Sequence, residues 1–203
     1  NECYENKAAG IGHREVGVTL VMENHIHHNG ASGLGFDTTS GGSVSKCVGN
    51  RIHDNHLVGV GIQKGWDVQL VGNEISRSGG MPPLVMIFEG SHAELTDNQL
   101  TGGGVASIRC AGSVLIEGNV INPDASSQGG RGPSSAIWAL PGAEVVAHGN
   151  EFLGWRKALL ASGAKVIASQ NRGFALHAKP FQIDKSVPGS RIGNNNIGTS
   201  SNE

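Results

Sequence analysis

Three charged side chains, Asp37, Glu89 and Arg109, are spaced so that they would share one outward row on adjacent layers of short strands. Layers of this kind stack about 4.8 Å apart, which places Asp37 and Glu89 about 10 Å apart, near the upper limit for two carboxylates flanking a water molecule. Arg109 beside Glu89 suits a second reaction, β-elimination, in which a cation offsets a substrate carboxylate while a base removes the adjacent proton. A ladder of exposed charges that only neutralise one another is the alternative.

Other polar and aromatic side chains near this row are candidates for holding a ligand. They are Arg14, Gln63, Lys64, Trp66 and Trp138. Trp66 offers a ring for stacking beside charges, or it only closes a turn. Two insertions, at residues 77–83 and 122–135, are predicted to form loops that wall the row beside Val85, Ile87 and Trp138, although drift in coil length explains them equally well.

A strip of glycines, Gly12, Gly35 and Gly61, is predicted to point outward beside the charged row, because the preceding residues face inward. Without side chains, this strip would form a shallow floor on which a flat ring could lie against the backbone. Glycine that is merely tolerated on an exposed sheet is the alternative.

The elements that must position these residues follow from a repeat. Asparagine recurs at intervals of 21 to 31 residues, at Asn1, Asn24, Asn50, Asn73, Asn98, Asn119, Asn150, Asn171 and Asn195. An apolar residue lies two positions after most of these asparagines, with Gly173 as the exception, and small or apolar pairs precede them with a period of two. Asparagine tolerates the left-handed backbone of a tight turn, and its amide can bond to an asparagine one layer away.

A unit of this length with three short strands cannot bury its apolar side alone, but stacked copies enclose a continuous core. The sequence therefore predicts an all-β parallel β-helix of about eight coils with an asparagine ladder. The inward residues of the fourth and fifth coils are aligned as Leu84, Met86 and Phe88 and as Ala106, Ile108 and Cys110.

Copies such as Asn24 to Asn29 and Gly33 to Gly35 resemble the right-handed parallel β-helix repeats of the pectate-lyase-like superfamily. The resemblance covers nearly the whole chain and implies the right-handed fold, but it leaves function open, because lyases, hydrolases, epimerases and non-catalytic surface proteins share this coil. Members that act on carbohydrate bind it on the outer face of a sheet. The segment Gly35, Phe36, Asp37 matches only the first three residues of an epimerase motif.

We expect residues 1–203 to form one β-helix domain, with residues 172–203 as an irregular C-terminal cap or tail. The chain opens directly on Asn1, so we also expect it to be a fragment of a longer chain or to associate end to end through uncapped coils.

Composition and charge exclude several classes of partner. A formal net charge of −2 does not attract nucleic acid or an anionic membrane. No apolar run approaches the length of a membrane span. Three cysteines do not indicate a disulfide framework.

Histidines cluster at His25, His27, His28, His53 and His56, and His27 and His53 should be stacked neighbours on the outside. Because zinc needs three or four convergent ligands and this pair supplies two, we predict no metal site and no cofactor. We expect a secreted, periplasmic or cell-surface protein that recognises an extracellular polysaccharide, and cleavage of that polysaccharide by a lyase or hydrolase reaction stays open. A non-catalytic surface, adhesin or spacer segment is the alternative.

Overall fold

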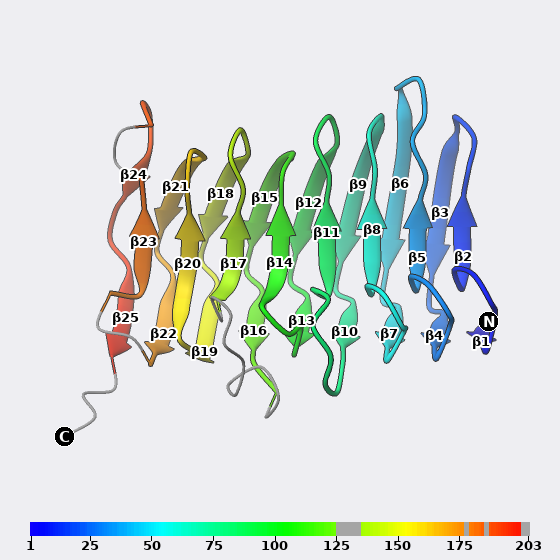
Figure 1. The fold of residues 1–203 in the computed structure, drawn as a ribbon, viewed down its shortest axis with the longest axis horizontal. Coiled ribbons are helices and arrows are strands. Elements are labelled where there is room, and N and C mark those ends of the chain that lie inside the picture. The colour runs from blue at the N-terminus through cyan, green and yellow to red at the C-terminus, as the bar shows by residue number, and fades with distance from the viewer. Residues whose placement is uncertain (125–134, 177–178, 185–186, 200–203) are drawn as a thin grey trace.

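The structure is a computed structural model, and it describes residues 1–124, 135–176, 179–184 and 187–199. Figure 1 shows strands stacked side by side along the long axis, from the N-terminal coil at one end to the C-terminal coil at the other. The described residues contain no helix, and therefore no helix long and apolar enough to cross a membrane. Each coil contributes one strand to each of three parallel sheets.

The first sheet, sheet A, has nine strands in the described residues. They are β1 (Glu2–Tyr4), β4 (His25–His27), β7 (Arg51–His53), β10 (Glu74–Ser76), β13 (Gln99–Thr101), β16 (Val120–Asn122), β19 (Glu151–Trp155), β22 (Arg172–Ala175) and β25 (Asn196–Thr199).

The second sheet, sheet B, has eight strands in the same part of the chain. They are β2 (Ile11–His13), β5 (Leu34–Phe36), β8 (Val60–Ile62), β11 (Val85–Ile87), β14 (Ala106–Cys110), β17 (Ser135–Ala139), β20 (Lys157–Ala161) and β23 (Phe181–Ile183).

The third sheet, sheet C, also has eight described strands. They are β3 (Val18–Met22), β6 (Ser43–Val48), β9 (Trp66–Val71), β12 (His92–Thr96), β15 (Ser113–Glu117), β18 (Glu144–His148), β21 (Lys165–Ser169) and β24 (Arg191–Ile192). Three sheets of this size form about eight coils, which confirms the predicted parallel β-helix.

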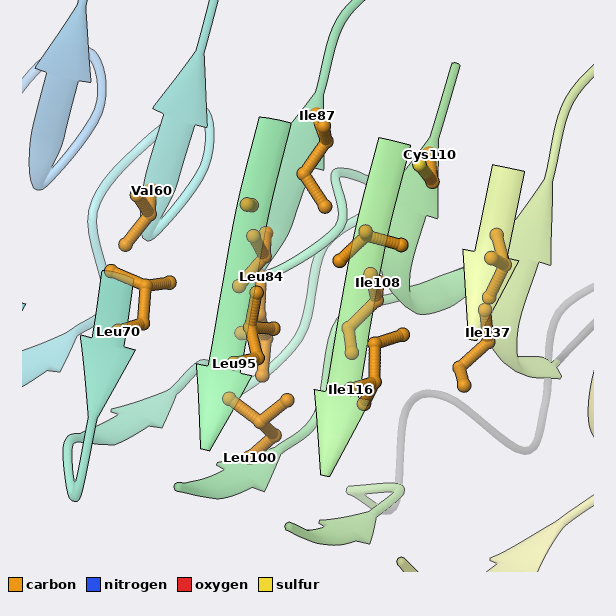
Figure 2. Packing of buried hydrophobic residues seen from close by; sticks show 14 of the residues in the cluster. Val60, Leu70, Leu84, Ile87, Leu95, Leu100, Ile108, Cys110, Ile116 and Ile137 are labelled. Carbon is orange, nitrogen blue, oxygen red and sulfur yellow. The ribbon is translucent and has the colours of Figure 1, made fainter. Parts of the chain in front are cut away.

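The core lies between the three sheets and is filled by residues that alternate along each strand. Figure 2 shows labelled side chains from sheets B and C gathered in this interior, among them Leu70, Leu95 and Ile116. These three are aligned in register on β9, β12 and β15 and are fully buried. Each coil therefore shares its apolar surface with the coils above and below it, as stacked repeats require.

The asparagine ladder is confirmed along the whole stack. The Nδ2 amide of each ladder asparagine donates to the Oδ1 of the next, at 2.7 to 3.0 Å, from Asn1 through to Asn195. A second, shorter ladder joins Asn6, Asn29 and Asn55 and ends at the guanidinium of Arg77, which donates to the carbonyl oxygen of Asn55. Both ladders fix the turns that lead into and out of the sheet A strands.

The predicted irregular tail at residues 172–203 is wrong for the described part of that segment. Strands β22, β23, β24 and β25 continue the three sheets, and β25 pairs in parallel with β22. Gly173 breaks the apolar pattern because its φ is +124°, and a Cβ there would lie 1.9 Å from the carbonyl oxygen of Phe152. Only glycine fits this close approach.

The predicted register of the fourth coil is also wrong by one residue. Val85 and Ile87 are fully buried, whereas Met86 lies on the outer face of the coil and Phe88 is 42 % exposed. Because side chains alternate along a strand, a shift of one position exchanges the inner and outer residues. Val85 and Ile87 therefore belong to the core and not to the wall of an outer groove.

Candidate functional site

The outer face of sheet B carries a cavity of about 360 Å³ over strands β2, β5, β8 and β11. Its floor includes the predicted glycine strip: Gly12, Gly35 and Gly61 pair with one another in register. A Cβ on Gly12 would meet no heavy atom within 4 Å, so this end of the floor opens directly to solvent. A flat ligand can therefore approach the backbone of the sheet.

Polar side chains occupy one side of the cavity. The Nε of Arg14 lies 3.6 Å from the Oδ2 of Asp37, and both side chains are more than half exposed. Gln63 follows Asp37 in the next coil, and its Oε1 accepts a hydrogen bond of 2.9 Å from the Thr38 hydroxyl. An exposed ion pair of this kind adds little stability, so its groups are free to exchange partners with a ligand.

Apolar side chains occupy the side of the cavity toward the fourth coil. Met86 pairs in register with Gly61, and Phe88 occupies the position that follows Gln63 in the outward row. The cavity thus combines an exposed aromatic ring with hydrogen-bonding side chains. Most binding sites for small apolar or amphipathic ligands have this composition.

The same outer face continues beyond the cavity through Arg109 and Trp138. Arg109 pairs in register with Met86 on one side and Trp138 on the other, and its guanidinium lies 4.8 Å from the Trp138 ring centroid. The Nε of Arg109 is buried and has no hydrogen-bond partner among the described residues. A cation held over an aromatic ring suits an anionic group on a ligand that extends along the stack.

Two predicted site residues lie elsewhere. Trp66 begins β9 with its side chain inward, only 2 % exposed, and its Nε1 donates to the carbonyl oxygen of Asp37 at 2.7 Å. The ring therefore supports the cavity from inside and cannot stack on a ligand. Glu89 lies one residue after Phe88, in an exposed turn, and Arg109 lies in the row of Gly61 and Met86, so neither shares the outward row of Asp37 that the sequence predicted.

Lys64 is exposed on a turn at the same end of the strands, where its side chain lies beside Gly90. The insertion at 77–83 is fixed by Arg77, which donates to the carbonyl oxygens of Leu57 and Pro82. Most of the second predicted loop, residues 125–134, lies outside the described residues. Among the described residues that line the cavity, Asp37 is the only acid.

A separate cluster of histidines lies on the outer face of sheet A. The stacked pair His27 and His53 is confirmed, with ring centroids 5.0 Å apart and planes within 4°. A third histidine, His25, joins the pair, and one ring nitrogen from each of the three lies within 4.8 Å of the others. The sequence signal for this cluster was the spacing of His25 and His27, because residues two positions apart on a strand point to the same face of the sheet.

The chain belongs to the family of right-handed parallel β-helices. The family model described as "Right handed beta helix region" matches residues 9–174. No curated protein and no solved structure matches the chain. The family fixes the coil and its handedness, and the site itself must supply the argument for function.

Proposed function

We propose that the protein binds an extracellular polysaccharide along the outer face of sheet B. The observation that carries the proposal is the cavity over the glycine strip, beside a row in which the hydrogen-bonding side chains are followed by Phe88. The face of a sugar ring is apolar and its rim carries hydroxyl groups, so this pairing of surfaces complements it.

The direction of the ligand follows from the stack. Adjacent coils repeat about every 4.8 Å, a spacing comparable to the length of one sugar residue in an extended chain. A polysaccharide that runs parallel to the long axis would therefore present successive sugars to successive coils. Its hydroxyl groups would bond to Arg14, Asp37 and Gln63, with one ring against Phe88.

An acidic polysaccharide is favoured over a neutral one. Arg109 holds its guanidinium over Trp138 on the same outward row as the cavity floor, one coil beyond Met86. A uronate carboxylate at this coil would accept hydrogen bonds from the guanidinium. Because Glu89 lies outside the row, the proposal is binding and contains no cleavage step.

Binding to a panel of polygalacturonate, alginate and a neutral xylan tests the proposal. At least one acidic polymer should bind, and Gly12→Leu, which fills the floor, should weaken binding about tenfold, equivalent to about 1.4 kcal/mol. Gly17→Leu is the matched control, since a Cβ at Gly17 also meets nothing within 4 Å, and Gly17 does not line the cavity.

A second matched pair examines the aromatic contact. Phe88→Ala should weaken binding, whereas Phe174→Ala should not, because Phe174 is similarly exposed at 44 % but lies on sheet A. Absence of binding to every polymer in the panel, or equal affinity in all four variants, would favour a spacer segment and refute the proposal.

A further inference from the structure

The histidine cluster on sheet A lies on a different face from the cavity and does not depend on the proposed function. Strands β1, β4 and β7 lie next to one another at the N-terminal end of the stack in Figure 1. His25 and His27 point outward on either side of the buried Ile26, and His53 pairs in register with His27. Glu2 pairs in register with His25 from the opposite side. Strands β4 and β7 therefore bring three imidazoles together, and Glu2 of β1 lies beside them.

The distances within this cluster are short. The Nε2 atoms of His25 and His53 lie 2.8 Å apart, and the Nε2 of His27 lies 3.2 Å from the Oε1 of Glu2. Ligands around a tetrahedral zinc ion with bonds of about 2.0–2.1 Å lie about 3.3 Å from one another. One ring nitrogen from each histidine lies within 4.8 Å of the others, so small side-chain rotations bring the three to this spacing.

The hydrogen bond of His53 directs its other ring nitrogen toward the cluster. The Nδ1 of His53 lies 3.0 Å from the Oδ2 of Asp54, and this bond requires the proton on Nδ1. The lone pair of Nε2 then faces the Nε2 of His25. A carboxylate that orients a histidine in this way is the usual outer partner of a metal-bound imidazole.

Asp54 is itself held in place by the adjacent coil. Its Oδ1 accepts hydrogen bonds from the backbone N–H and the hydroxyl of Ser78, at 2.9 and 2.8 Å. The Nδ1 of His25 lies 3.3 Å from Glu2, and the Nδ1 of His27 lies 2.8 Å from the Nδ1 of His28. The Nδ1 of each histidine in the cluster thus has a polar partner, and the Nε2 atoms of His25 and His53 face each other.

Two facing lone pairs need a proton or a cation between them. A divalent metal ion between the two nitrogens accepts both lone pairs.

We propose that His25, His27 and His53 bind a divalent transition-metal ion, each through one ring nitrogen. Three imidazoles suit zinc, which leaves a fourth position for water, and they also suit nickel or copper. The third histidine corrects the expectation from the sequence, in which His27 and His53 alone supplied too few ligands.

Calorimetric titration of the tag-free, chelator-treated protein with Zn²⁺ at pH 7.5 tests the proposal. One ion should bind per chain, and His25→Ala and His53→Ala should each weaken binding at least tenfold. His92→Ala is the matched control, because His92 is a partly exposed histidine on sheet C near Glu94. The thermal unfolding of each metal-free variant shows that it folds.

A positioning variant separates a metal site from a simple row of surface histidines. Asp54→Asn keeps all three ligands and tolerates the positive φ of 50° at this position, yet it should weaken zinc binding about 10–100-fold. No zinc binding, or binding that survives unchanged in His25→Ala and His53→Ala, would overturn the proposal.

Discussion

Replacing Asn98 with alanine tests the asparagine ladder in the middle of the stack. Asn98 is 1 % exposed, and its Oδ1 accepts hydrogen bonds from both the backbone N–H and the side-chain amide of Asn73, at 2.8 and 2.9 Å. Its own amide donates to the carbonyl oxygen of Leu70 and to the Oδ1 of Asn119. The substitution therefore removes one acceptor that serves two buried donors.

The expected loss follows from those two donors. A buried donor left without a partner costs about 1–3 kcal/mol, so Asn98→Ala should lower the free energy of unfolding by about 2–6 kcal/mol. The backbone N–H of residue 98 still bonds to Asn119, which keeps the turn in place. The effect should therefore appear as lower stability and not as a different fold.

Urea unfolding followed by circular dichroism measures this change, provided that the dependence of the free energy on urea stays the same. Asn196→Ala is the control, because this asparagine is exposed in the strand that follows the last ladder residue, and its change should stay within about 0.5 kcal/mol. A loss below about 1 kcal/mol for Asn98→Ala would refute the reasoning, since the donors of Asn73 would then have found other partners.

Two further predictions concern single positions. Gly173→Ala should lower the free energy of unfolding by about 1–3 kcal/mol, measured by the same urea assay, because a Cβ there meets the Phe152 backbone; an unchanged midpoint would contradict the close approach. Burial lowers the pKa of His13, which stacks on Phe36 at 4.4 Å, so the folded protein resists a proton that the unfolded chain accepts below about pH 6.5. Stability should therefore decline as the pH falls from 7 to 5, and the decline should be smaller in His13→Phe; an equally steep decline would contradict this assignment.

The fold was predictable because its information is local and repeated. Each ladder asparagine and the apolar residue after it lie within one turn and one strand, and the same pairing recurs in coil after coil. Ile108 and Cys110 were correctly predicted to face inward from the same alternation, and both are fully buried. The glycine strip of the cavity followed from this register in the first three coils.

The rest of the site depended on positions that the repeat does not fix. Because residues 77–83 are inserted, the repeat length does not show at which residue the next strand begins. The prediction was wrong by one position, and it therefore placed Met86 and Phe88 in the core and Glu89 in the outward row. Trp66 follows a glycine turn, where nothing local shows that the strand begins with an inward residue. His25 meets His53 diagonally across two strands, a contact that depends on side-chain directions.

Methionine methyl resonances give the most direct test of the claim that sheet B carries the binding face. The chain has 3 methionines: Met86 lines the cavity, whereas Met22 and Met81 are 46 % and 63 % exposed outside it. With ¹³C-methyl labelling, titration with oligogalacturonate and oligomannuronate should shift the Met86 resonance saturably with at least one of the two and leave the others in place. A Met86 resonance unmoved by both ligands, or saturable shifts confined to Met22 or Met81, would contradict the account.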